Sequence, residues 1–154
     1  MIVPKVLFVC LGNICRSPTA EAVFTTRAKQ AGLDVHVESA GTSGWHIGEP
    51  PDPRSIAAGE ARGYSFQGQA SRKVIRADFG NFDYILAMDD KNVEALKETS
   101  PENYWQRIQL FLDYAPSNTV REVPDPYYGS GDGFTRVLDL IEQASDGLIA
   151  VLSK

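Results

Sequence analysis

The sequence predicts an α/β fold: a single three-layer domain in which helices cover both faces of a four-stranded parallel sheet. Three observations predict this class. Short apolar runs alternate with helix-like stretches along the chain, as in parallel strands joined by right-handed crossovers. In the first run, residues 5–9, the stretch from Val6 to Val9 is continuously apolar, as expected of a strand buried on both faces. No repeat, low-complexity tract or long linker divides the 154 residues, so one domain is expected to span 1–154.

The expected elements follow from local patterns and their end signals. Ser17-Pro18 begins the first helix, since Ser can cap a helix and Pro suits its first position, and Gly32 ends it. Asp52 is expected to cap the second helix, which Gly63 ends. Strands are expected at residues 5–9, 35–38, 84–88 and 108–112. Helices are expected at residues 18–31, 53–62, 89–98 and, as a long amphipathic helix, 134–151.

The segment between the first strand and the first helix, Cys10-Leu-Gly-Asn-Ile-Cys-Arg-Ser17, has the pattern of an anion-binding loop. Its cysteine and arginine are separated by five residues and can surround one tetrahedral anion. Gly12 permits a left-handed turn and Asn13 tolerates one, and successive N–H groups in such a turn point inward. The helix N-terminus that follows and the planar fork of Arg16 both favour a dianion. We therefore expect a phosphate-binding loop directly after the first strand.

Cys10 is the expected nucleophile beneath this loop. A helix N-terminus and a neighbouring cation both favour the thiolate form of a cysteine, and the hydroxyl of Ser17 can donate to the sulfur. Ligands of parallel sheets bind beyond the carboxyl ends of the strands, and Cys10 lies at that end of the first strand. The alternative is a buried cysteine that only packs at a strand end. The spacing to Arg16 and the Gly-Asn turn favour the catalytic interpretation.

Transfer of a phosphoryl group from an oxygen ester to sulfur requires an acid that protonates the leaving oxygen. Asp125 is the candidate, because prolines on both sides restrict its backbone; the alternative is an ordinary turn residue. Tyr127 and Tyr128 follow it and could wall an aromatic substrate. Trp45 is a further candidate wall, with a loop anchor tucked into the core as its alternative, and His46 beside it is expected at the rim.

Two nucleotide-binding interpretations are rejected. The P-loop of NTPases requires Gly-x4-Gly-Lys-Ser/Thr, and the Cys10 loop contains no such lysine. The segment Gly129-Ser-Gly-Asp-Gly133 superficially resembles a dinucleotide fingerprint, but it follows no predicted strand and lacks the final x-x-Gly. A turn in which Ser130 or Asp132 caps the last helix is the preferred interpretation.

Composition bounds the partners and the compartment. The formal net charge of −5 argues against nucleic-acid binding through a general positive field. The apolar run at residues 6–11 is too short to span a membrane, and the first five residues do not resemble a signal peptide. Two cysteines five residues apart do not make a disulfide framework. We expect a cytoplasmic, reduced protein that binds no membrane, and a monomer.

The chain resembles the low-molecular-weight protein tyrosine phosphatases over nearly its whole length. The motifs that carry the resemblance are Val6 to Pro18, Ser39-Ala-Gly41, Trp45, Pro51-Asp-Pro-Arg54, Phe82 to Leu86, Met88-Asp89 and Asp125 to Gly129. The resemblance implies hydrolysis of phosphotyrosine and small aryl phosphates through a phosphocysteine intermediate. It further implies that Cys10 is the nucleophile, Arg16 binds the phosphate and Asp125 is the general acid and base.

The same resemblance implies supporting roles. Asn13 and Ser39 would fix the loop by hydrogen bonds, Ser17 would steady the thiolate, and Gly12 and Cys15 complete the loop. The phosphotyrosine slot would be surrounded by Leu11, Ile14, Trp45, Tyr127 and Tyr128. The family fold needs no metal, and no other cofactor is expected. The implied partners are phosphotyrosine-containing proteins, with inorganic phosphate or other oxyanions as product or inhibitor.

Three other functions are weighed against this one. An arsenate reductase resembles this fold but passes oxidation to further cysteines late in the chain, and none follows Cys15. A phosphate-binding module without turnover would not need Cys10, Arg16 and Asp125 together. Phosphoarginine phosphatases of the family resemble the chain less, with a threonine where it has Ile14. Cys15 itself is open to two interpretations: a partner for a reversible disulfide with Cys10 after oxidation, or a small apolar filler of the loop.

Overall fold

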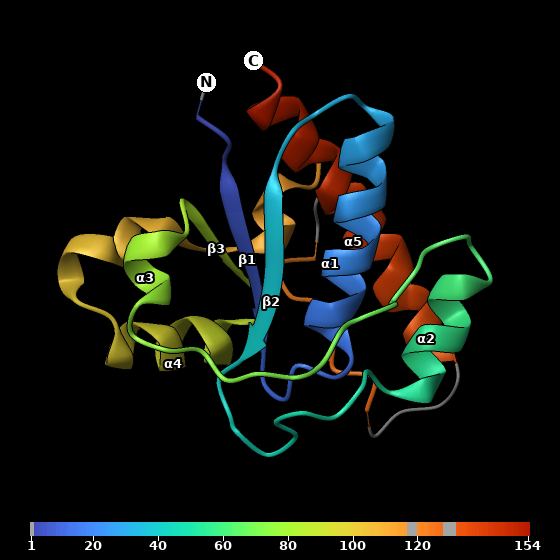
Figure 1. Ribbon diagram of the computed structural model, residues 1–154, viewed down its shortest axis with the longest axis horizontal. Helices are drawn as coiled ribbons and strands as arrows, with labels where there is room; N and C mark the ends of the chain where they lie inside the picture. The colour runs from blue at the N-terminus through green and yellow to red at the C-terminus, as the bar shows by residue number, and fades with distance from the viewer. Residues whose placement is uncertain (1, 117–119, 128–131) are drawn as a thin grey trace.

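The four strands form one parallel sheet, as predicted. The computed structural model describes residues 2–116, 120–127 and 132–154 (Figure 1). Its strands are β1 (Lys5–Cys10), β2 (His36–Gly41), β3 (Tyr84–Ala87) and β4 (Ile108–Leu110). Their order in the sheet is β2-β1-β3-β4, and all pairs are parallel. β1 is therefore an inner strand, hydrogen-bonded on both edges, and the loop that follows it begins at the middle of the sheet.

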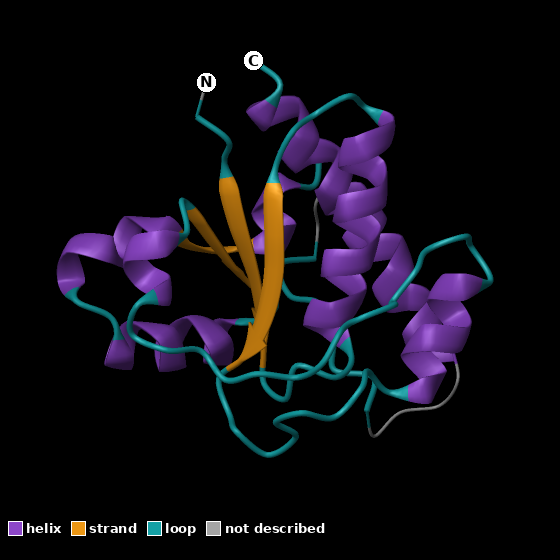
Figure 2. Ribbon diagram, in the orientation of Figure 1, coloured by secondary structure: helices purple, strands orange, loops and turns teal. Residues whose placement is uncertain are grey.

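Helices cover both faces of the sheet, which gives the three predicted layers (Figure 2). On one face lie α1 (Arg16–Gln30) and α5 (Asp132–Leu152), and on the other α3 (Asp78–Asn81) and α4 (Asp90–Thr99). The short helix α2 (Pro53–Glu60) lies beside α1 and α5. Within the described ranges, no helix is long and apolar enough to cross a membrane.

The core explains why the sequence of β1 is continuously apolar. Val6 and Phe8 belong to the cluster packed against α1 and α5, whereas Leu7 and Val9 belong to the cluster packed against α3 and α4. All four side chains are fully buried, and the ring of Phe8 packs edge-on against that of Phe111, with 4.8 Å between centroids. Because close packing on both sides leaves β1 little freedom, its carboxyl end is a rigid support for the loop.

The start of α1 differs from the prediction. Ser17 does not cap this helix: α1 begins at Arg16, and its N-cap residue Cys15 makes no side-chain capping hydrogen bond. The hydroxyl of Ser17 instead lies 3.0 Å from the sulfur of Cys10, where the alternative expectation for this residue placed it. The other end signal is confirmed, since Gly32 follows the helix with a φ of 72°. The cap of α2 is also confirmed, because the side chain of Asp52 accepts from the backbone N–H of Arg54.

Several short segments differ from the expected elements. α3 and two 3₁₀ turns, η1 (Glu102–Arg107) and η2 (Phe111–Tyr114), have no predicted counterpart. The fourth strand is shorter than predicted, because β4 ends at Leu110 and the two apolar residues that follow are buried in η2. An apolar run indicates that its residues are buried, but burial alone does not distinguish a strand from a turn. Asp132 is the first residue of α5, and Ser130 lies outside the described residues.

The contact between α5 and η2 supports a prediction about stability. A Cβ added at Gly147 of α5 would lie 1.6 Å from the carbonyl oxygen of Tyr114, so the helix must shift to accept any side chain. We expect Gly147→Ala to lower the free energy of unfolding by about 1–3 kcal/mol or more, measured by chemical denaturation. Gly133→Ala in the same helix is the control, because its Cβ would come no closer than 3.4 Å to Pro126. Equal stability of the two variants would contradict the prediction.

Candidate active site

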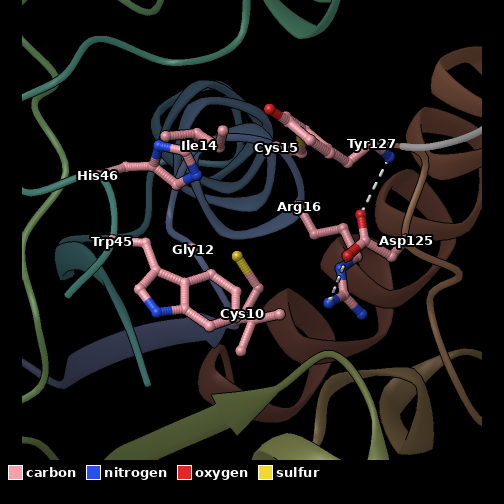
Figure 3. A pocket seen from close by; sticks show the side chains of 10 residues that line it. Cys10, Gly12, Ile14, Cys15, Arg16, Trp45, His46, Asp125 and Tyr127 are labelled. Atoms are coloured by element: carbon pink, nitrogen blue, oxygen red, sulfur yellow. Dashed lines mark hydrogen bonds and ion pairs between the residues drawn. The ribbon is translucent and has the colours of Figure 1, made fainter. Parts of the chain in front are cut away.

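The segment from Cys10 to Arg16 joins the carboxyl end of β1 to α1 and forms one side of a pocket (Figure 3). The sulfur of Cys10 points into this pocket, toward the space between Trp45, Arg16 and Asp125. Residues from three distant parts of the chain contribute to its lining: Cys10, Leu11, Gly12, Ile14, Cys15, Arg16, Trp45, His46, Asp125 and Tyr127.

The left-handed residue of the loop is Asn13, not Gly12. Asn13 has a φ of 55°, whereas Gly12 is not among the residues with positive φ. Gly12 is needed for a different reason, because a Cβ there would lie 3.0 Å from Cδ2 of His46. The expected left-handed turn is therefore present at Asn13, whereas the side chain of His46, which is distant in the sequence, approaches Gly12.

The thiol of Cys10 is buried and accepts or shares hydrogen bonds from two groups. Its sulfur lies 3.3 Å from the donating backbone nitrogen of Asn13 and 3.0 Å from Oγ of Ser17. The side-chain nitrogen of Asn13 donates to Oγ of Ser17 at 2.7 Å, so that oxygen is already an acceptor. The hydroxyl hydrogen of Ser17 is therefore free for the sulfur, with the carbonyl of Ala40 a more distant alternative at 3.4 Å. Two hydrogen-bond donors are thus aimed at one sulfur.

The orientation of Asn13 is itself fixed from outside the loop. Its side-chain nitrogen also donates to Oγ of Ser39 at 3.0 Å, and its Oδ1 accepts from the backbone nitrogen of Arg72 at 3.0 Å. Ser39 in turn donates to Oε1 of Glu21 at 2.7 Å. Burial raises the pKa of Glu21, although the hydrogen bond from Ser39 opposes this shift. Strand β2, helix α1 and the segment before α3 together hold the amide that serves the thiol.

Arg16 is buried at the N-terminus of α1 and is held by partners on one side of its guanidinium. Its Nη1 donates to Oδ2 of Asp89 at 2.6 Å and to the carbonyl of Val123 at 3.0 Å. Burial alone would lower the pKa of Arg16, but the neighbouring Cys10 and Asp89 raise it overall. The guanidinium is therefore a permanent cation whose orientation is set before an anion binds.

Asp125 lies on the opposite side of the pocket from Trp45 (Figure 3). One carboxylate oxygen, Oδ2, is 3.6 Å from Nη2 of Arg16, and the other, Oδ1, accepts from the backbone nitrogen of Tyr127 at 3.0 Å. The side chain is 36% exposed, so its carboxyl group can reach a ligand in the pocket. The chain thus brings a thiol, a cation and a carboxyl group to one space.

The walls of the pocket are mainly apolar. Trp45 is 70% exposed, so the core-anchor alternative for this residue is wrong. Tyr127 forms the facing wall, and Arg54 holds it by donating to its carbonyl at 3.0 Å while stacking 5.6 Å from the centre of its ring. His46 is at the rim, as expected, with its Nδ1 2.7 Å from Oε2 of Glu49. Tyr128, the second predicted tyrosine wall, lies outside the described residues.

The sequence interpretation missed the residues that support the site from behind. Asp89 follows the carboxyl end of β3, so the rule that placed Cys10 could also have pointed to it. Its Oδ1 accepts from the backbone of Asn92 at the start of α4, while Oδ2 holds Arg16. For Glu21 and Arg72 no local signal exists, because each acts across the fold. Among the residues that the structure describes, no group of three His, Cys, Asp or Glu side chains is placed to hold a metal ion.

Cys15 differs from Cys10 in its surroundings. It is buried in a small apolar cluster with Ile14 and Phe134. Burial raises the pKa of the Cys15 thiol to about 12, against a lowering effect of the hydrogen bond to Ser55. A protonated thiol is a poor nucleophile, so these surroundings favour the filler interpretation over a ready disulfide partner.

A modification experiment tests this difference. With a pKa of about 12, roughly 10⁻⁴ of the Cys15 thiol is ionised at pH 8. We expect iodoacetamide at pH 8 to leave Cys15 unmodified in the folded protein and to modify it in denaturant, as mapped by peptide mass spectrometry. Alkylation of Cys15 at the same rate in both states would contradict the burial argument.

Comparison with known proteins agrees with this geometry. Residues 5–154 match the family model of the low molecular weight phosphotyrosine protein phosphatases. The chain is 42% identical to a low molecular weight protein-tyrosine-phosphatase of Bacillus subtilis, covering 97% of this chain and 96% of the relative. It is 45% identical to a low molecular weight phosphotyrosine protein phosphatase of Schizosaccharomyces pombe, covering 84% and 85%. A crystal structure of a protein tyrosine phosphatase from Entamoeba histolytica, with Hepes in its active site, superposes with a TM-score of 0.94 at 45% identity, covering 97% of each chain.

Proposed function

Because the chain belongs to the low molecular weight phosphotyrosine protein phosphatase family, we propose that it hydrolyses phosphotyrosine in proteins by way of a phosphocysteine at Cys10. The observation that carries this proposal is the placement of the Cys10 sulfur in a pocket that Arg16 and Asp125 also line. A nucleophile, an anion ligand and a proton donor in one space are the groups that phosphoryl transfer to a side chain requires.

In the first step the thiolate of Cys10 attacks phosphorus in line with the bond to the tyrosine oxygen. An S–P bond forms, the P–O bond breaks, and Asp125 gives its proton to the departing phenolic oxygen. Protonation is needed because a phenolate is a poor leaving group for a reaction at neutral pH. The products are free tyrosine in the protein substrate, a phosphocysteine and the carboxylate of Asp125.

In the second step Asp125 acts in the opposite sense. Its carboxylate takes a proton from a water molecule that attacks the phosphocysteine, and the S–P bond breaks. Inorganic phosphate leaves, the thiolate of Cys10 is restored, and Asp125 is again protonated. Ser17 and the backbone N–H of Asn13 support this step because both lie within reach of the sulfur, at 3.0 and 3.3 Å, and stabilise it as a leaving group.

Arg16 stabilises the transferring group in both steps. Asp89 and the carbonyl of Val123 occupy its Nη1, which leaves Nη2 and Nε as a fork for two oxygens of the phosphoryl group. Oδ2 of Asp125 lies 3.6 Å from Nη2. We propose that a bound dianion replaces this ion pair, so that Asp125 turns to the leaving oxygen as the substrate enters.

The pocket walls select the substrate class. A phosphotyrosine ring is flat and long enough to carry its phosphorus to a sulfur at the base of the pocket, and the apolar residues Leu11, Ile14, Trp45 and Tyr127 line the way. Phosphoserine has a shorter, non-aromatic side chain, which would leave these walls uncovered. Small aryl phosphates share the ring and are expected substrates too.

We further propose that the enzyme acts as a monomer in the cytoplasm. One chain brings Cys10, Arg16 and Asp125 to the same pocket, so the proposed chemistry requires no second copy. It needs Cys10 as a free thiol, a form that a reducing compartment maintains. Inorganic phosphate and similar oxyanions would compete with substrate, because they fit the same loop.

Replacing the nucleophile tests the covalent route. Cys10→Ser substitutes a hydroxyl that is not ionised at neutral pH, so we expect no measurable turnover of p-nitrophenyl phosphate. The variant should still bind inorganic phosphate, measured by calorimetry, since Arg16 and the loop backbone remain. Substantial residual turnover in this variant would rule out the phosphocysteine intermediate.

Replacing the acid tests the assignment of Asp125. Asp125→Ala is expected to lower kcat on phosphotyrosine roughly 10²–10⁴-fold. The loss should be smaller on a dinitrophenyl phosphate, whose leaving group departs without a proton. Equal losses on both substrates would remove Asp125 from the acid role.

A further inference from the structure

An exposed apolar strip leads away from the pocket on its Trp45 side. Trp45 is 70% exposed and Ile47 is 62% exposed. A Cβ at Gly44 would lie 3.2 Å from Cδ1 of Ile47 and 3.7 Å from Cδ of Lys73. The side chains of Ile47 and Lys73 therefore both lie beside Gly44, one residue before the pocket wall.

The strip continues into a second cavity. The segment 71–76 runs past the carboxyl end of β2 toward α3 (Figure 1), and Lys73 pairs with Gly41 there as an isolated bridge. Between this segment and α4 lies a cavity lined by Thr42, Lys73, Val74, Ile75, Arg76, Phe79, Ala95, Leu96 and Thr99. Its position is rigidly tied to the phosphate-binding loop, since the backbone nitrogen of Thr42 donates to the carbonyl of Cys10 at 2.9 Å.

The lining of this cavity is positively charged, whereas the chain as a whole is acidic. Lys73 and Arg76 are its only charged lining residues, and no carboxylate lines it. Within the described part of the chain, neither side chain makes a hydrogen bond or an ion pair, although the formal net charge is −5. Beside them Ile75 is 58% exposed. Two unpartnered cations next to exposed apolar surface are complementary to a segment that carries both carboxylates and an apolar side chain.

We propose that the strip of Trp45, Ile47, Lys73, Ile75 and Arg76 docks the part of a phosphoprotein substrate that flanks its phosphotyrosine, and that it selects acidic and apolar residues there. The inference rests on the proposed function, because the occupant is argued from continuity with the pocket that holds the phosphotyrosine itself. A strand-like peptide advances about 3.3–3.6 Å per residue, so residues a few positions away from the phosphotyrosine would reach Lys73 and Arg76.

The test compares phosphotyrosine peptides that differ only in their flanking residues. One set carries two Asp and a Leu at two to six positions before or after the phosphotyrosine, and the matched set carries two Lys and a Leu. For the unsubstituted enzyme at low ionic strength, we expect KM to be about tenfold lower for the best acidic peptide than for its basic counterpart, from two charge contacts of modest strength. This preference should shrink in high salt, because exposed charges are screened.

Charge reversal locates the preference. Lys73→Glu with Arg76→Glu is expected to raise KM for the acidic peptide about tenfold or more and to leave kcat and KM for p-nitrophenyl phosphate unchanged. Lys29→Glu with Lys154→Glu reverses the same number of charges, in the last turn of α1 and at the C-terminal residue, outside the lining of this cavity, and serves as control. Ile75→Ser is expected to raise KM by weakening the contact with the Leu of the peptide, without changing the preference for acidic over basic peptides. Single Ala variants at 73 and 76, each with part of the effect, guard against misfolding of the double variant.

Two results would overturn the docking proposal: equal KM for acidic and basic peptides, or equal effects of the double variant and its control. Neither result touches the catalytic assignment, which the turnover of p-nitrophenyl phosphate reports separately. Conversely, failure of the enzyme to hydrolyse p-nitrophenyl phosphate would contradict the proposed function. In that case, the affinities of the Cys10→Ser variant for the two peptide sets would still decide whether the strip prefers acidic segments.

Discussion

The left-handed backbone at Asn13 is the constraint on which the rest of the site depends. With a φ of 55°, it turns the loop so that its own N–H meets the sulfur of Cys10 while its side chain reaches Ser17 and Ser39. A non-glycine residue in this region stores strain that the surroundings must hold. Here the surroundings are hydrogen bonds from Arg72 and to Ser39. The same contacts that hold the strain therefore also aim two donors at one thiol.

The charges of the pocket form a second level of organisation. Arg16 is a buried cation, and two carboxylates approach it with different partners. Asp89 is fixed at the N-terminus of α4 by its contact with Asn92, so it can only orient the guanidinium. Asp125 is more exposed and is tied mainly to the backbone N–H of Tyr127, so it can turn toward a ligand. In the proposed mechanism, positioning and proton transfer are thus divided between two residues of the same chemical type.

Much of the fold could be predicted because its signals are local. The structure confirms three expectations that depend only on neighbouring residues in the sequence. These are the burial of β1 from Val6 onward, the capping of α2 by Asp52 and the end of α1 at Gly32. The errors lie where distant contacts decide. Ser17 does not cap α1, although its hydroxyl does lie beside the sulfur of Cys10 as expected. The left-handed residue of the loop is Asn13, and the side chain of His46 approaches Gly12. A residue type shows what a group can do, whereas its partner depends on the fold.

The sequence by itself determined the parallel α/β class and the position of the loop between the first strand and the first helix, and it supplied the candidates for nucleophile, cation and acid. These follow from periodicity and spacing, which are properties of neighbouring residues. Only the tertiary structure decided that Asp125 faces Arg16 and that Asp89 orients that arginine. It also decided that Arg72 holds Asn13 directly, while Glu21 acts on Asn13 through Ser39. The physical reason is that hydrogen bonds and ion pairs act over a few ångströms, and parallel crossovers bring together residues that lie tens of positions apart.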